Sequence, residues 1–153
     1  MFVDSLIVPH CVYRPGSFSG LMTIYESNFI KLGQLVARLH RLEATAERLI
    51  SRTPRDCDLY LEIVSREPYT TTLKLTYWFG TDSDERVPDP DLTVRVYHDA
   101  RLVEAVAGRE THHHRMLCEL ALRHSVELGR RWRRNIMLNK WLDFLIEMGH
   151  EFP

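Results

Sequence analysis

A histidine and an aspartate stand side by side at His98 and Asp99, at the end of a segment that alternates apolar and polar residues. An imidazole beside a carboxylate could act as a general base or bind a metal there. The same pair is also typical of a hairpin turn, in which the aspartate accepts hydrogen bonds from nearby backbone N–H groups. The sequence carries no phosphate-loop, dinucleotide-binding, HExxH or nucleophile-elbow motif that would favour an enzyme.

Four arginines surround a tryptophan in the segment Arg130-Arg131-Trp132-Arg133-Arg134. Guanidinium groups bind phosphates through paired hydrogen bonds, and an indole ring can stack on a base. These five residues are therefore candidate ligands for nucleic acid or phosphate. In the alternative interpretation, Trp132 is the first core residue of the last helix and the arginines form its solvated rim. Positive charge is mildly unfavourable at the start of a helix, which hints at an anionic partner.

The remaining histidines and cysteines do not predict a metal site. His112, His113 and His114 are consecutive, so on a helix their side chains point about 100° apart and cannot converge on one ion. Cys11 and Cys118 are far from each other and from Cys57, and none has a metal-binding spacing. We therefore expect neither a metal nor another cofactor.

The middle of the chain predicts an antiparallel sheet, because its apolar residues recur with a period of two. Four strands are expected, beginning near Leu59, Thr72, Leu92 and Leu102, and consecutive strands usually pair as a meander. Residues 80–91 are expected to be a solvated loop rather than strand, because prolines at 88 and 90 cannot donate to a ladder.

The alternation also divides the sheet into two faces. If the leucines and valines of the second and third strands face the helices, the other face is polar and carries Thr70, Thr72, Lys74, Thr76, Trp78, Arg95 and Tyr97. Cations among hydroxyl groups and aromatic rings could form a shallow platform for an anion or a nucleotide. The alternative is the ordinary polar face of a one-sided antiparallel sheet. Candidate ligand-binding residues are Lys74, Arg95, Tyr97, His98 and Asp99.

Helical periodicity predicts one helix on each side of this sheet in the sequence. Apolar residues three and four apart place a helix from Leu21 to Leu39. Helix-favouring residues continue to Ile50, with a break near His40, and Thr53-Pro54 ends the helix. A second helix begins near Trp132 and ends at Met148, where Gly149 is a left-handed cap. Residues 109–128 are ambiguous and lean towards helix.

These elements predict an α+β fold: a meander of about four strands covered on one face by an N-terminal and a C-terminal helix. Residues 1–20 form an extended arm, and residues 21–153 form a single domain. The apolar arm residues Phe2, Leu6, Ile7 and Val8 could cross to a second subunit and make a homodimer.

Size and charge exclude several classes of protein. The chain has 153 residues and a formal charge of −1, which gives one domain and no overall field towards nucleic acid or an anionic membrane. No apolar run approaches the roughly 18 residues of a membrane span, and the N-terminus lacks the basic segment of a signal peptide. A cytoplasmic location is expected.

Four segments, 25–32, 69–75, 91–101 and 138–142, carry a likeness to a known family; they read YESNFIKL, YTTTLKL, DLTVRVYHDAR and LNKWL. In these segments the chain resembles the YqiB-like family of small, mainly proteobacterial proteins, a domain of unknown function. The resemblance implies no reaction, cofactor or catalytic residue.

Three functional hypotheses follow. The first is a non-catalytic cytoplasmic module that binds a protein partner or a phosphate-bearing ligand. The second is an RNA- or DNA-binding protein that acts through Arg130–Arg134, which a strong salt dependence of binding would reveal. The third is a hydrolase that uses His98 and Asp99, which a pH-dependent turnover would reveal.

Overall fold

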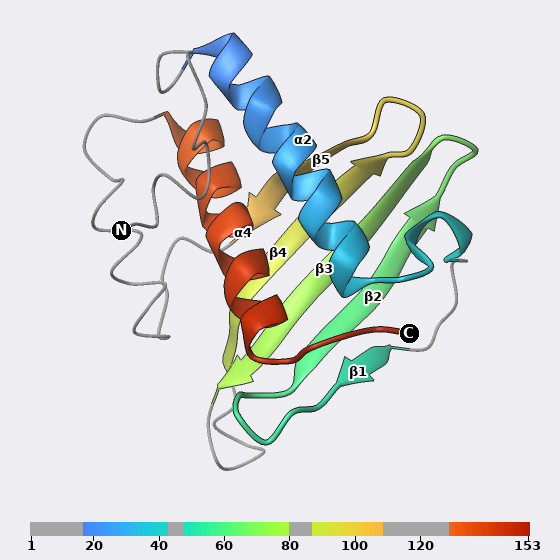
Figure 1. The fold of residues 1–153 in the computed structure, drawn as a ribbon, viewed down its shortest axis with the longest axis vertical. Helices are drawn as coiled ribbons and strands as arrows, with labels where there is room; N and C mark the ends of the chain where they lie inside the picture. Colours follow the sequence, from blue (N-terminus) through green and yellow to red (C-terminus); the bar gives the residue numbers. More distant parts are fainter. Residues whose placement is uncertain (1–16, 43–47, 80–86, 109–128) are drawn as a thin grey trace.

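A computed structural model describes residues 17–42, 48–79, 87–108 and 129–153. The described residues form a five-stranded antiparallel sheet with two long helices packed on one face (Figure 1). The helices are α2 (Phe18–Leu35) and α4 (Arg130–Glu147), with a short 3-10 turn η1 (Leu39–Arg41) after α2. The strands are β1 (Leu49–Ser51), β2 (Leu59–Arg66), β3 (Thr70–Phe79), β4 (Val87–Tyr97) and β5 (Leu102–Gly108). The predicted α+β class is confirmed, with one strand more than expected.

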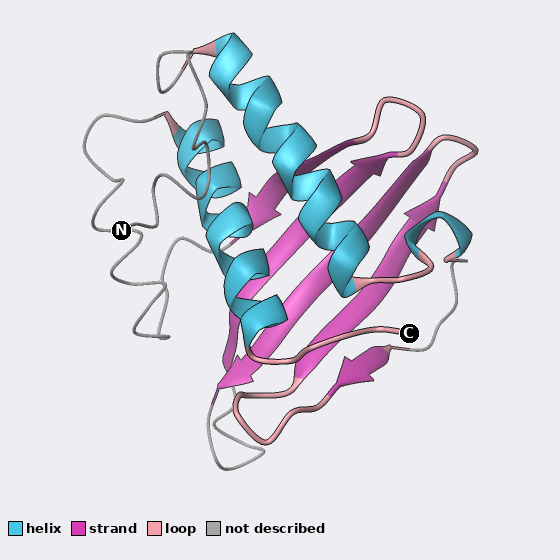
Figure 2. Cartoon of the chain, viewed as in Figure 1, coloured by secondary structure: helices cyan, strands magenta, loops and turns pink. Residues whose placement is uncertain are grey.

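The sheet is a simple meander in the order β1-β2-β3-β4-β5, and both helices lie on the same side of it (Figure 2). The predicted division into two faces is confirmed. Leu73 and Leu75 on β3, and Val94 and Val96 on β4, have no exposed surface and form the core beneath the helices. The residues between them therefore point to the opposite face, which we call the open face.

Strand β1 corrects the prediction that helix continues to Ile50. Helix α2 ends at Leu35, and Leu49 and Ser51 pair with Leu61 and Leu59 of β2. Local helix propensity is a weak preference, and the ladder partners that β2 offers outweigh it.

The start of β4 corrects the prediction that residues 80–91 are all loop, because residues 87–91 already belong to the strand. Pro88 lies opposite Trp78 on β3, next to a register shift between Thr76 and Trp78. On its other side β4 pairs with β5 only from Leu92 onward. Among the described residues, β4 therefore has a single ladder partner at these prolines, and the missing proline N–H groups break no hydrogen bond on its other edge.

Helix α2 begins three residues earlier than predicted, because Ser17 caps it through a hydrogen bond from the Gly20 backbone N–H. Helix α4 ends as predicted, with Gly149 in a left-handed conformation at φ 90°. The two helices run parallel, since Ile24 packs with Trp132 near their starts and Lys31 Nζ lies 2.7 Å from Asp143 further along.

Asparagines from both helices bind the backbone of the edge strand β5. Asn135 Oδ1 accepts the Ala105 N–H at 2.7 Å, and its amide group donates to the Ala105 carbonyl. Asn28 on α2 donates to the Val103 carbonyl and accepts from Asn139. All three asparagines are fully buried. Their side chains form hydrogen bonds with backbone N–H and carbonyl groups of β5 that would otherwise be buried without a partner.

Candidate binding site on the open sheet face

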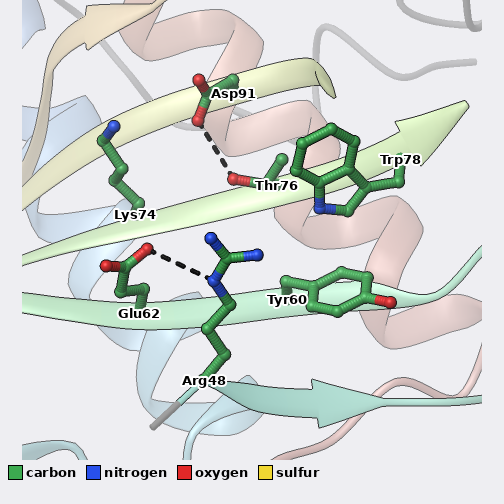
Figure 3. Close-up of a pocket in the computed structure, with 7 residues that line it drawn as sticks. All are labelled: Arg48, Tyr60, Glu62, Lys74, Thr76, Trp78 and Asp91. Carbon is green, nitrogen blue, oxygen red and sulfur yellow. Dashed lines mark hydrogen bonds and ion pairs between the residues drawn. The ribbon is translucent and has the colours of Figure 1, made fainter. Parts of the chain in front are cut away.

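A pocket of about 190 Å³ lies on the open face, over strands β2, β3 and β4 and the residue before β1 (Figure 3). It is lined by Arg48, Tyr60, Glu62, Lys74, Thr76, Trp78 and Asp91. The alternation in the sequence predicts Lys74, Thr76 and Trp78 on this face but does not single out the other four residues. Cross-strand register brings them together, since Glu62 lies opposite Lys74, and Tyr60 and Asp91 lie on either side of Thr76.

The rings of Tyr60 and Trp78 lie at one end of the pocket (Figure 3). Tyr60 is the cross-strand neighbour of Thr76, and Trp78 follows Thr76 by two residues on the same face. Both side chains are partly exposed. Aromatic faces that reach solvent in this way can stack on a flat ring of a ligand.

Lys74 lies at the other end of the pocket, and the guanidinium of Arg48 lies between Glu62 and Tyr60 (Figure 3). Arg48 Nε is 3.7 Å from Glu62 Oε2, and both side chains are about half exposed. Such an exposed ion pair is held weakly and can be exchanged for another anion. Lys74 lines the pocket and has no hydrogen bond or ion pair with any residue in the described part of the chain.

Asp91 is the second carboxylate of the pocket. Its Oδ1 accepts a hydrogen bond from Thr76 Oγ1 at 3.0 Å. Among the described residues no lysine, arginine or histidine forms an ion pair with it. With two cations and two carboxylates the pocket is formally neutral, so a single small anionic group suits it better than a polyanion. Its volume lies below the roughly 300–1,000 Å³ usual for whole drug-sized ligands, which also limits it to a small ligand.

Arg95 and Tyr97 lie on the same face as the pocket but further along β4, and they do not line it. The Tyr97 hydroxyl donates to Glu104 Oε1 on β5 at 2.6 Å. Burial and this hydrogen bond raise the pKa of Tyr97, and a hydrogen bond with Tyr97 raises the pKa of Arg95. These side chains are therefore held in a cross-strand chain of their own, separate from the pocket.

The structure places His98 with the buried side of the sheet and not beside Lys74. His98 Nε2 lies 2.7 Å from the hydroxyl of Thr71, which is fully buried and pairs with Val96. Arg66 donates to the same hydroxyl at 2.8 Å. Burial, followed by the charges of Arg66 and His40, lowers the pKa of His98.

Asp99 is exposed and serves the turn after β4. Its Oδ1 accepts the Ala100 backbone N–H at 2.9 Å, as an aspartate does in a turn. No hydrogen bond joins it to His98 within the described chain. The structure therefore does not arrange these two residues as an acid–base pair, and each has a structural partner instead.

The tryptophan inside the arginine cluster at the start of α4 is not exposed to solvent. Trp132 is 4% exposed and packs against Ile24, Ile136 and Leu21, so its indole cannot stack on a base. Arg134 donates to the Val106 carbonyl at 3.0 Å, while Arg130 and Arg131 are exposed. This burial agrees with the alternative interpretation, in which Trp132 is the first core residue of the last helix, and not with Trp132 as a ligand for nucleic acid.

A serine, a histidine and an aspartate form a hydrogen-bonded chain that no spacing in the sequence predicts. Ser51 Oγ lies 2.9 Å from His150 Nδ1, and His150 Nε2 lies 3.1 Å from Asp56 Oδ2. Ser51 and His150 are only 5% and 3% exposed, and Ser51 Oγ also accepts the Glu151 N–H. A substrate carbonyl cannot approach this serine, so the chain fastens the C-terminal tail to β1 and the β1–β2 loop.

The described residues contain no cluster of three or more histidine, cysteine, aspartate or glutamate side chains suited to a metal. They also contain no helix long and apolar enough to cross a bilayer. His112, His113 and His114, the predicted arm up to residue 16 and the ambiguous segment 109–128 lie outside the described residues.

Comparison with known families matches residues 31–151 to a family described as protein of unknown function (DUF1249). No curated protein and no solved structure matches the chain. The matched range includes every residue that lines the pocket.

Proposed function

Because the chain belongs to the DUF1249 family, whose function is unknown, we propose its function from the pocket: it is a non-catalytic module that binds a small phosphate-bearing ligand with a flat ring. Lys74 and Arg48 bind the phosphate group, and Trp78 and Tyr60 contact the ring. A nucleoside monophosphate has both parts, and the pocket of about 190 Å³ would hold only part of it, with the remainder in solvent.

The observation that carries this proposal is the ammonium group of Lys74, which has no partner in the described residues and stands in a pocket with two partly exposed rings. An unpaired lysine on an exposed sheet is ordinary by itself. Its place in one pocket with a weakly paired arginine and two aromatic rings makes it a phosphate ligand near a stacking surface (Figure 3).

Isothermal titration with the four common ribonucleoside monophosphates, with the corresponding nucleosides and with inorganic phosphate tests the proposal. We expect at least one monophosphate to bind, and its nucleoside to bind more weakly. Lys74→Met should weaken binding about tenfold, the effect of losing one hydrogen bond to a charged group. The matched control Arg41→Met alters an exposed cation outside the pocket and should leave binding unchanged.

The ring end has its own pair of variants. Trp78→Leu should weaken binding, whereas Tyr69→Leu removes an aromatic side chain that is 67% exposed and lies outside the pocket. Failure of all four monophosphates to bind, or equal binding by the Lys74 and Arg41 variants, would overturn the proposal.

The second candidate function, nucleic-acid binding through Arg130–Arg134, rests on the exposure of Arg130 and Arg131 and on the absence of acidic residues in the first turn of α4. It predicts a salt-sensitive affinity for single-stranded RNA or DNA that reversal of Arg131 and Arg134 to glutamate abolishes. Trp132 has no part in this candidate, because it is buried.

We propose further that the protein is a YqiB-like protein of the bacterial cytoplasm. The four sequence segments that resemble this family, at 25–32, 69–75, 91–101 and 138–142, support that assignment. We also propose that the chain binds a protein partner or a second copy of itself, and sedimentation of the purified protein tests the homodimer.

A further inference from the structure

We infer that the carboxylate of Asp91 accepts hydrogen bonds from the ring of the ligand and that the pocket therefore prefers guanine to adenine nucleotides. This inference rests on the proposed function, since it concerns the base of the nucleotide whose phosphate Lys74 and Arg48 bind. Its basis is that Lys74 and Asp91, neither of which has an ion-pair partner among the described residues, line one pocket from two neighbouring cross-strand rows.

The two charges lie in different rows across the strands. Glu62, Lys74 and Thr93 are cross-strand neighbours in one row, and Tyr60, Thr76 and Asp91 are neighbours in the next row on the same face. Two residues along a strand separate such rows by roughly 7 Å. A ligand with its phosphate on the first row and its ring on the second therefore turns one edge of the ring towards Asp91.

The carboxylate of Asp91 is oriented and incompletely satisfied. Thr76 donates to Oδ1 at 3.0 Å and fixes the plane of the group. Asp91 is partly buried and has no cation partner in the described residues, whereas Glu62 has Arg48. An ionised carboxylate has about four acceptor sites and no donor, so Asp91 still requires N–H or O–H donors.

Guanine provides such hydrogen-bond donors better than the other common bases do. Its N1–H and N2–H₂ groups are adjacent donors and can bind both oxygens of one carboxylate. The corresponding edge of adenine offers one donor beside an acceptor nitrogen, and that acceptor would face the negative charge of Asp91. The site thus favours guanine by attraction and disfavours adenine by repulsion.

Titration of the wild-type protein with the monophosphates of guanosine, inosine, adenosine and xanthosine tests the inference. Guanosine monophosphate should bind about tenfold more tightly than inosine monophosphate, which lacks the N2 amino group, and adenosine monophosphate should bind more weakly still. Equal affinities for the guanine and adenine nucleotides would overturn the inference and leave the proposed function intact. Absence of binding by all four would overturn the inference, and absence of binding by the cytidine and uridine monophosphates as well would overturn the proposed function.

The variant Asp91→Asn gives a complementary test. An amide presents one donor and one acceptor, so this variant should lose the preference for guanine and gain affinity for xanthosine monophosphate, in which a carbonyl replaces the amino group. The control Asp99→Asn alters an exposed turn aspartate and should keep the wild-type order of affinities. An Asp91→Asn variant that folds and keeps the wild-type order contradicts the inference. If it does not fold, the wild-type series decides.

Discussion

The Nε2 atom of His150 lies 3.1 Å from Oδ2 of Asp56 and joins the C-terminal tail to the loop between β1 and β2. The Tyr77 hydroxyl donates to the same carboxylate oxygen. The same loop also binds the end of α4, because Thr53 and Arg55 donate to the carbonyls of Met148 and Glu147. Asp56 is therefore a central residue of the link between the tail and the sheet.

The first prediction concerns the effect of pH on this link. Burial alone would raise the pKa of Asp56, but hydrogen bonds from His150, Tyr77 and the Cys57 backbone together hold it below its usual 3.8. A carboxyl whose pKa is lowered on folding stabilises the folded state above the unfolded pKa and loses that contribution as the pH falls through the folded pKa. Asp56→Asn should reduce the free energy of unfolding by about 2 kcal/mol near neutral pH.

Denaturant unfolding of wild type and Asp56→Asn as a function of pH measures this difference. We expect it to be constant above about pH 5 and to shrink below pH 3.8. Asp58→Asn removes only the exposed pair with Arg52 and should cost less than about 1 kcal/mol at any pH. A difference for Asp56→Asn that grows as the pH falls would contradict the account.

The second prediction concerns His98, whose pKa is lowered by burial and by the charges of Arg66 and His40. A histidine with a lowered pKa in the folded state stabilises the fold fully above its unfolded value of 6.5 and loses that contribution as the pH falls through the folded value. A nuclear magnetic resonance titration of the imidazole should give a midpoint below 6.5, and His98→Ala should lower stability. A raised midpoint would instead point to a general base held by Asp99.

The third prediction concerns Asn135 and the edge of the sheet. Replacement by alanine leaves the buried N–H and carbonyl of Ala105 without their side-chain partner, at a cost of about 2–4 kcal/mol. The Ala105 amide should also exchange with solvent faster than in the wild-type protein, whereas Arg131→Ala at an exposed position should change neither quantity. Unchanged protection of Ala105 would show that the asparagine is dispensable at this edge.

The fourth prediction separates Trp132 from the arginines that surround it. Trp132→Ala should cost about 3–5 kcal/mol of stability, because it leaves a cavity between α2 and α4. Arg131→Glu, at an exposed position, should change stability by less than about 0.5 kcal/mol. A small effect for Trp132→Ala would mean that the indole is available to a ligand after all.

The sheet and its two faces could be predicted from the sequence because their signal is local. Leu73 and Leu75 alternate with Lys74 and Thr76, and the alternation by itself decides which of them is buried. The two helices carry an equally local period, and the left-handed Gly149 marks the end of the second.

The remaining features depend on contacts between distant parts of the chain. Strand β1 has three residues and becomes a strand only because β2 offers it partners. Arg48 and Tyr60 reach Lys74 and Trp78 through strand register, which composition and periodicity do not fix. Ser51 and His150 are 99 residues apart in sequence, and no spacing rule relates them. If the alternation of β4 is continued by one residue beyond Tyr97, His98 falls on the buried face and Lys74 on the open face. The sequence could therefore have predicted that these two residues lie apart.

The most direct test of the central claim is a heteronuclear magnetic resonance titration of the labelled protein with guanosine monophosphate. Trp78 is the partly exposed tryptophan, whereas Trp132 and Trp141 are buried, so its indole N–H signal reports on the pocket. The account predicts that this signal and the backbone amides of Glu62, Lys74 and Thr76 shift together and saturably, while those of α4 stay in place. Shifts confined to residues 130–134, or no shift at all, would contradict it.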